Sequence, residues 1–83
     1  MQKSIYSRDQ ELLQGLLRDL RKRKGYRQQD LADLLDVPQS FVSKYEAGER
    51  RLDILEIRKI CSVFSISLAD FVKELEGRIR EAE

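Results

Sequence analysis

The feature that most constrains the fold is a pair of short helical segments separated by only three residues. The segments span about 28–35 and 39–46, and Asp36-Val37-Pro38 interrupts the helical pattern between them. Aspartate tolerates the left-handed backbone conformation better than most residues, and proline is accepted in a first helical turn. Two helices joined by so short a turn must cross at a steep angle. The sequence therefore predicts a tight helical corner.

Three further helices are predicted from capping residues and from apolar residues at helical spacing. The first spans about 8–24, between a capping box that starts at Ser7 and the helix-ending Gly25. The fourth starts after Asp53 and runs to about 64, and the fifth is capped by Ser67 and runs to about 81. The residues expected to be buried by the fourth helix are Leu55, Ile57, Ile60, Cys61 and Phe64. With no strand-like alternation, the prediction is one all-α domain of five helices, residues 1–83.

Composition excludes several classes of function. The 83 residues contain no histidine and a single cysteine, Cys61, so His-based catalysis, a disulfide and a metal cluster are not expected. A chain of this length encloses little of a pocket, which argues against an enzyme and against a cofactor. The sequence contains no run of about 18 apolar residues, so a membrane helix is not expected. The start of the chain does not resemble a signal peptide. A cytoplasmic protein is the simplest expectation.

Charge is distributed unevenly along the chain. Residues 1–51 contain 11 lysines and arginines against 8 acidic residues, whereas residues 52–83 contain 5 against 7. Six of the ten residues in 18–27 are basic. The first part is therefore suited to a negatively charged partner. Basic residues also favour helix C-termini, so Lys22, Arg23 and Lys24 can equally be a solvated helix end.

The outer face of the helix at 39–46 carries the candidate binding residues. Its inner positions pack into the corner, which leaves polar side chains outside, namely Gln39, Ser40, Ser43 and Lys44. Glutamine and serine can hydrogen-bond to base edges, and lysine can reach guanine or a phosphate. A narrow helix with short polar groups at its N-terminal end fits the major groove of DNA.

In this region the sequence resembles the helix-turn-helix domain of the lambda repressor, 434 repressor and Cro group, the Xre family. The resemblance covers about residues 8–75 and is densest over 21–50, where Q-x-x-L-A at Gln28 and Q-S-x-V-S-K-x-E-x-G at Gln39 match in order and spacing. It implies a compact lambda-repressor-like domain, with the helix-turn-helix at about 28–47, that binds double-stranded DNA and regulates transcription. A repressor of the phage or bacterial type is the expected function.

The resemblance also implies roles for individual residues. Gln28 would contact a phosphate and brace Gln39, which reads base edges together with Ser40, Ser43 and Lys44. Arg21 and Glu46 match a family ion pair that holds the fold. The remaining candidates for DNA backbone contact are Arg27, Arg50 and Arg51.

Four positions depart from the family pattern. Asp36 and Ser65 stand where glycine is common, and Arg27 and Pro38 stand where Ser or Thr often caps a helix. Each is compatible with the fold, and they bear on turn geometry more than on function.

The fifth helix is expected to make a homodimer, as the family does on palindromic sites. An apolar stripe flanked by charges of both signs continues past what one small core needs. Its residues are Leu68, Phe71, Val72, Leu75 and Ile79. The alternative is a terminal helix that only covers the core.

Two other functions stay open. The chain could be an antitoxin-type regulator that also binds a toxin or another regulatory protein, or an interaction domain without DNA binding.

The position of Phe41 is also open, since it could lie in the core or meet a thymine methyl group. Cys61 is expected to be a buried, inert thiol.

Overall fold

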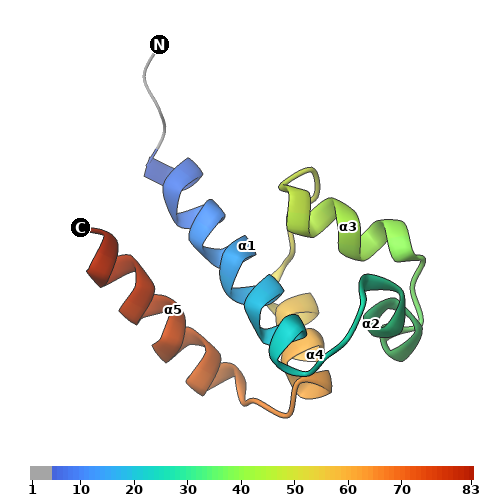
Figure 1. Cartoon of the computed structure of the whole chain (residues 1–83). Coiled ribbons are helices and arrows are strands. Elements are labelled where there is room, and N and C mark those ends of the chain that lie inside the picture. The colour runs from blue at the N-terminus through green and yellow to red at the C-terminus, as the bar shows by residue number, and fades with distance from the viewer. Residues whose placement is uncertain (1–4) are drawn as a thin grey trace.

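The computed structural model describes the backbone of residues 5–83 and the side chains of residues 8–83. Five helices follow one another along this part of the chain, and no strand occurs within it. The helices are α1 (Ile5–Arg23), α2 (Gln28–Leu35), α3 (Gln39–Ala47), α4 (Ile54–Val63) and α5 (Leu68–Ala82). Figure 1 shows α5 beside α1, with α2 and α3 together at the other end of the molecule. The predicted all-α fold of five helices is confirmed.

The start of α1 differs from the prediction. The helix begins at Ile5, so Ser7 lies inside it and cannot be its N-cap, a position that needs a non-helical backbone. Its end is as predicted, because Gly25 takes the left-handed conformation at φ 74°. The Gly25 and Tyr26 amides donate to carbonyls of the last turn, at 2.9 and 3.2 Å. This arrangement satisfies carbonyls that the helix end would leave unpaired.

The predicted corner between α2 and α3 is also present. Asp36 adopts the left-handed conformation at φ 59°, and its amide donates to the last turn of α2. Val37 donates to the carbonyl of Ala32 at 3.0 Å, and Pro38, at φ −64°, leads directly into α3. The helix α3 ends at Ala47, one residue later than predicted, before Gly48 at φ 82°.

The starts of α4 and α5 are fixed by the predicted caps. The Asp53 carboxylate accepts a hydrogen bond from the Glu56 amide at 2.7 Å, and the Glu56 carboxylate accepts one from the Asp53 amide at 2.9 Å. Ser67 accepts from the amide of Asp70 at 3.0 Å. Such reciprocal and single caps satisfy the free amides of a first helical turn.

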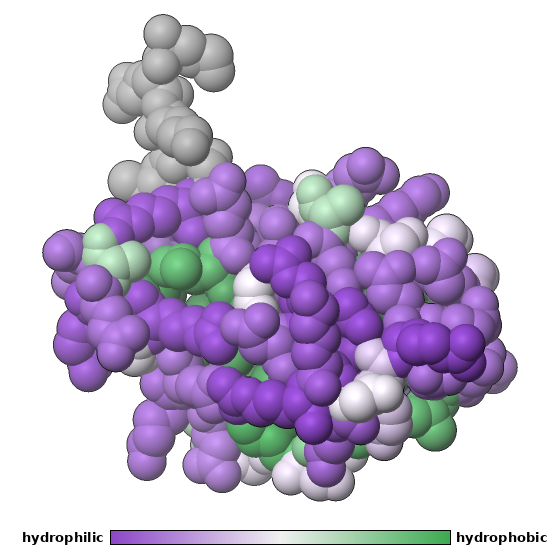
Figure 2. Space-filling view, in the orientation of Figure 1, coloured by the Kyte–Doolittle hydropathy of each residue, from purple (hydrophilic) through white to green (hydrophobic). Residues whose placement is uncertain are grey.

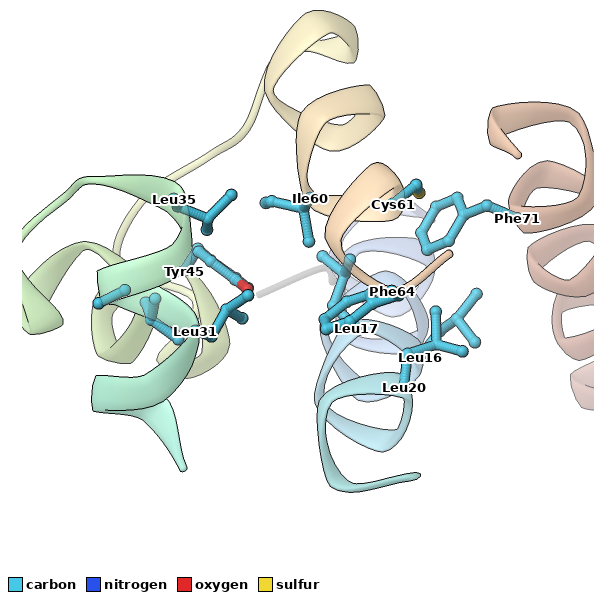
Figure 3. Close-up of a cluster of buried hydrophobic side chains, with 12 residues drawn as sticks. Leu16, Leu17, Leu20, Leu31, Leu35, Tyr45, Ile60, Cys61, Phe64 and Phe71 are labelled. Carbon is cyan, nitrogen blue, oxygen red and sulfur yellow. The ribbon is translucent and has the colours of Figure 1, made fainter. Parts of the chain in front are cut away.

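All five helices contribute to one hydrophobic core. Figure 3 shows Leu16, Leu17 and Leu20 of α1 in the middle of this core, between the α2–α3 corner on one side and α5 on the other, with Phe71 of α5 beside Cys61. Cys61 is 1% exposed, and burial raises the pKa of its thiol to about 11, in agreement with an inert thiol.

The prediction that Leu55 is buried is wrong, since this side chain is 72% exposed. Residues advance by about 100° along a helix, so the inward face set by Ile60, Cys61 and Phe64 leaves Leu55 on the outer side of α4. Leu34 of α2 is a second exposed leucine, at 55%. Figure 2 shows a mostly hydrophilic surface interrupted by small hydrophobic areas.

Two ion pairs connect α1 to α5 on the surface. Arg78 contacts Asp19 at 3.0 Å, and Arg23 contacts Glu74 at 3.2 Å. Exposed pairs of this kind contribute little stability, about 0–1 kcal/mol each. Among residues 5–83, no helix is long and apolar enough to cross a membrane.

Candidate nucleic-acid interface

The first turn of α3 presents polar side chains to solvent. Gln39, Ser40 and Lys44 are exposed, whereas Val42, Tyr45 and Glu46 are buried on the opposite face. The N-cap is Pro38, which supplies no side-chain acceptor, so backbone amides at this end of the helix are left for another partner. Within the described chain, no carboxylate pairs with Lys44. This turn can therefore donate hydrogen bonds to a ligand.

Ser43 is less available than its neighbours. Its side chain is half-buried, and its hydroxyl donates to the Ser40 carbonyl at 3.2 Å. The hydroxyl oxygen can still accept a hydrogen bond. Of the four residues predicted to reach bases, Ser43 is thus the least exposed.

A buried ion pair joins the end of α1 to the end of α3. Arg21 Nε donates to Glu46 Oε2 at 2.7 Å, and a second guanidinium nitrogen donates to Oε1 at 3.0 Å. A third nitrogen of Arg21 donates to the Tyr26 carbonyl at 2.7 Å. The two side chains are nearly enclosed, and the hydrogen bond to Glu46 raises the pKa of Arg21 further above its ordinary value. The partners named by the family resemblance therefore meet here.

Two glutamines extend this ion pair to the surface. Gln28, at the start of α2, donates to Glu46 Oε1 at 3.0 Å. Gln39 donates in turn to Gln28 Oε1 at 2.7 Å. The contact between Gln28 and Gln39 matches the expected bracing. The bond from Gln28 to Glu46 was not expected from the sequence, because nothing in the spacing of residues 28 and 46 predicts it.

The two arginines that follow α3 have different surroundings. The Arg50 guanidinium lies 4.3 Å from the centre of the Phe41 ring and donates to the Glu56 carboxylate at 3.0 and 3.3 Å. These hydrogen bonds hold the pKa of Glu56 below its usual value. Arg51 is exposed. Of the two predicted phosphate contacts, the fold engages Arg50 and leaves Arg51 free to reach a ligand.

Phe41 lies against the core. Its ring is half-buried and meets the Tyr45 ring edge-on, with centroids 5.9 Å apart. Arg50 covers its other side. Of the two positions left open by the sequence, the structure shows the one in which Phe41 packs with the core.

Arg27 caps no helix with its side chain, because a guanidinium has no acceptor. The cap comes from Asp30, which accepts the Arg27 amide at 2.8 Å and pairs with the guanidinium at 2.9 Å. These contacts with Arg27 lower the pKa of Asp30 to about 2. The Arg27 side chain remains largely exposed beside the start of α2.

The predicted dimer residues do not form one exposed stripe. Phe71 is 1% exposed in the core of the monomer, so its assignment to a dimer surface is wrong. Leu68 and Leu75 are packed against the same core, and Val72 is the exposed member at 43%. Ile79 is half-buried. Most residues of the stripe therefore pack against the monomer core, and the exposed apolar surface of α5 is smaller than predicted.

Apolar side chains are also exposed on α4. Ile54 and Leu55 are 63% and 72% exposed. A hollow between the two helices joins Leu55 to Ile66 and Leu68, and its lining also includes Arg58, Lys59, Ser62 and Ser67. The apolar pattern of the fourth helix predicts Leu55 in the core, so the sequence does not identify this surface. Over residues 5–83, no group of three potential metal ligands comes together.

Comparisons with known proteins agree with this architecture. The model of the helix-turn-helix family matches residues 17–71. The crystal structure of ClgR, a clp gene regulator from Corynebacterium glutamicum, has a TM-score of 0.78 at 26% identity, covering 89% of this chain and 79% of that one. The crystal structure of a point mutant of the restriction-modification controller protein C.Esp1396I has a TM-score of 0.84 at 23% identity, covering 99% and 100%. The comparison with curated proteins gave no match.

Proposed function

The chain belongs to the Xre-type helix-turn-helix family of DNA-binding transcription regulators, and on this premise we propose that it recognises a specific sequence in double-stranded DNA. In the proposed complex α3 lies in the major groove, with its first turn against the base edges. The observation that carries the proposal is the exposed polar start of α3, where Gln39, Ser40 and Lys44 stand free of the core. Each good bidentate base contact contributes about 1–3 kcal/mol of discrimination.

Contacts with the DNA backbone would position the helix in the groove. Arg27 directly precedes α2 and Arg51 follows α3, and both side chains are exposed. Gln28 has one amide N–H beyond the one that it donates to Glu46, so it can also contact a phosphate. Arg50 and Arg27 contribute less to this attraction than Arg51, because Glu56 and Asp30 already pair with their guanidinium groups. Phosphate contacts of this kind make binding salt-dependent.

We further propose that the protein acts as a homodimer and as a repressor. One domain of this size reads few base pairs, and a two-fold pair reads two half-sites. The apolar residues exposed on α4 and α5, Leu55 and Val72, are the support for a self-association surface. A dimer that occupies an operator would exclude other proteins from that DNA. Because its ligand would be bacterial or phage DNA, we place the protein in the cytoplasm.

The two alternatives predict a different surface on α3. An interaction domain without DNA binding needs no row of exposed hydrogen-bonding side chains there, yet Gln39, Ser40 and Lys44 are present. An antitoxin-type regulator would keep DNA binding and add a protein partner, for which the α4–α5 surface is the available place. The exposed polar side chains of α3 therefore favour DNA binding, with or without an additional protein partner.

Titration of the ¹⁵N-labelled protein with a short random duplex at low salt tests the binding mode without knowledge of the operator. We expect the largest amide shifts at residues 39–44, at Gln28 and at Arg51, with small shifts in α5. A control titration uses a polyanion of similar charge, such as heparin. It should shift the amide signals of the arginines without concentrating shifts on the first turn of α3. Shifts centred on α1 and α5, or none, would contradict the proposed docking.

A further inference from the structure

A second hollow lies between the α2–α3 corner and α4, and we call it the corner hollow. It has a volume of about 260 Å³. Four segments contribute its lining, namely the end of α2, the turn after it, the start of α3 and the first two turns of α4. The lining residues are Leu35, Val37, Phe41, Glu56, Lys59 and Ile60. None of the predicted DNA contacts is among them, and neither is Leu55 or Val72.

Most of the corner hollow is apolar. Leu35 and Ile60 are buried, whereas Val37 and Phe41 are half-buried. Figure 3 shows Leu35 and Ile60 facing each other across the space between α2 and α4. An apolar cavity of about 150 Å³ is large enough to bind benzene. The corner hollow therefore has room for an aromatic ring with a short substituent.

The two charged side chains of the corner hollow differ in their partners. Both carboxylate oxygens of Glu56 are engaged, since Arg50 donates to each and the Asp53 amide donates to one of them. Lys59 is exposed, and no carboxylate of residues 8–83 pairs with it. A lysine ammonium has three N–H donors and no acceptor. The charged group left without a partner is thus a cation, which fits an anionic group on a ligand.

We propose that the corner hollow binds a small aromatic carboxylate. The ring lies against Phe41, Val37 and Ile60, and the carboxylate pairs with the ammonium group of Lys59. A neutral compound of the same shape forms no ion pair and so binds more weakly. The site is independent of the proposed function, because no residue assigned to DNA contact or to self-association lines it.

Phenylacetate is the probe, and 2-phenylethanol is its neutral counterpart of similar shape. Each compound is titrated into ¹⁵N,¹³C-labelled protein, and the amide and methyl signals are followed. Phenylacetate should cause saturable shifts at Leu35, Val37, Phe41 and Ile60. A dissociation constant of about 1 mM is expected for a ligand of roughly ten non-hydrogen atoms. The alcohol should bind about fivefold more weakly, by the size of one exposed ion pair. Acetate controls for ionic strength and should not shift these signals.

Lys59→Met tests the ion pair, because it removes the charge and keeps a long side chain. It should raise the dissociation constant of phenylacetate by about fivefold and leave that of 2-phenylethanol unchanged. Arg58→Met is the matched control. Arg58 is the neighbouring exposed cation on α4, but it lines the hollow beside Leu55 and not the corner hollow. Its removal should leave both dissociation constants at the wild-type values.

Three results would overturn the inference. They are the absence of saturable shifts with phenylacetate, equal affinity of wild type for the acid and the alcohol, and equal losses in Lys59→Met and Arg58→Met. Shifts of the lining residues that follow protein concentration instead of phenylacetate would place a second copy in the corner hollow and overturn it as well. A protein that binds phenylacetate and selects no DNA sequence would contradict the proposed function alone.

Discussion

Arg50 and Arg51 are adjacent in the sequence but differ in their contacts and in their availability to a ligand. Arg50 lies over Phe41 and donates to Glu56, whereas Arg51 is exposed. The sequence places both in the loop after α3 and does not distinguish them. The distinction depends on Glu56, whose position is fixed by the capping box of α4.

Arg51→Ala should weaken binding to all duplexes alike and reduce the slope of log K against log salt by about 1. Arg50→Ala should change the slope less, because the Glu56 carboxylate already balances its charge. Fluorescence anisotropy with a labelled duplex, over about 50–200 mM salt, measures both slopes. Equal slope changes in the two variants would show that Arg50 is not held away from the phosphates.

Thermal unfolding of the same two variants gives the complementary result. Arg50→Ala loses an ion pair and a cation–π contact, so its free energy of unfolding should fall by about 1 kcal/mol. Arg51→Ala should unfold as the wild type does. An Arg50→Ala protein with the wild-type free energy of unfolding would mean that these contacts add no measurable stability.

Single residues also show where prediction from sequence fails. An apolar residue on the stripe of α5 can face the monomer core or a partner, and periodicity alone cannot separate the two. The stripe pattern predicts Phe71 at a dimer surface, whereas the side chain lies in the core of the monomer. The bond from Gln28 to Glu46 depends on the crossing of α2 and α3, so no local pattern contains it.

Among the elements, the connection between α4 and α5 holds a strained position. Ser65 has φ 59°, a conformation that costs a residue with a side chain about 1–2 kcal/mol. Ser65 stands where glycine is common in the family, and glycine adopts this conformation without strain. Ser62, three residues earlier, lies within α4 and donates to the Lys59 carbonyl.

Ser65→Gly should raise the free energy of unfolding by about 1 kcal/mol, because glycine adopts the left-handed conformation without strain. Ser62→Gly is the matched control and should lower it by about 0.5 kcal/mol, since glycine weakens a helix interior. Urea unfolding followed by circular dichroism measures both. Destabilisation of both variants to the same extent would argue against strain at Ser65.

The ends of the helices were more predictable than their faces. Asp53, Ser67, Gly25 and the turn at Asp36 act within a few residues of themselves, so local sequence determines them. Ser7 was the exception, since a capping-box pattern also occurs inside a helix and the longer α1 overrides it. The outward position of Leu55 required knowledge of which side of α4 meets the rest of the molecule.

At the scale of the whole molecule, polar and apolar surfaces are on different elements. The polar start of α3 belongs to the α2–α3 end, and the exposed Leu55 and Val72 lie on α4 and α5. Figure 1 shows α3 and α5 well separated. Such a separation would allow one surface to meet DNA while the other meets a second copy.

Leu55→Glu should convert the proposed dimer to a monomer by placing a charge on its apolar surface. Leu34→Glu is the control, because Leu34 is an exposed leucine of α2, 55% exposed against 72% for Leu55. Sedimentation velocity at micromolar concentration should show a monomer for the first variant and a dimer for the second, with wild-type circular dichroism for both. A wild-type protein that sediments as a monomer, or a Leu55→Glu protein that remains dimeric, would contradict this placement.

Selection from random duplex DNA by the purified protein at moderate salt, followed by sequencing of the retained molecules, tests sequence-specific DNA recognition most directly. We expect a palindrome with half-sites about one helical turn apart. Circular dichroism of the same sample confirms that the protein is folded. Retained DNA with no enrichment over the input would contradict sequence-specific recognition and favour a role in protein interaction.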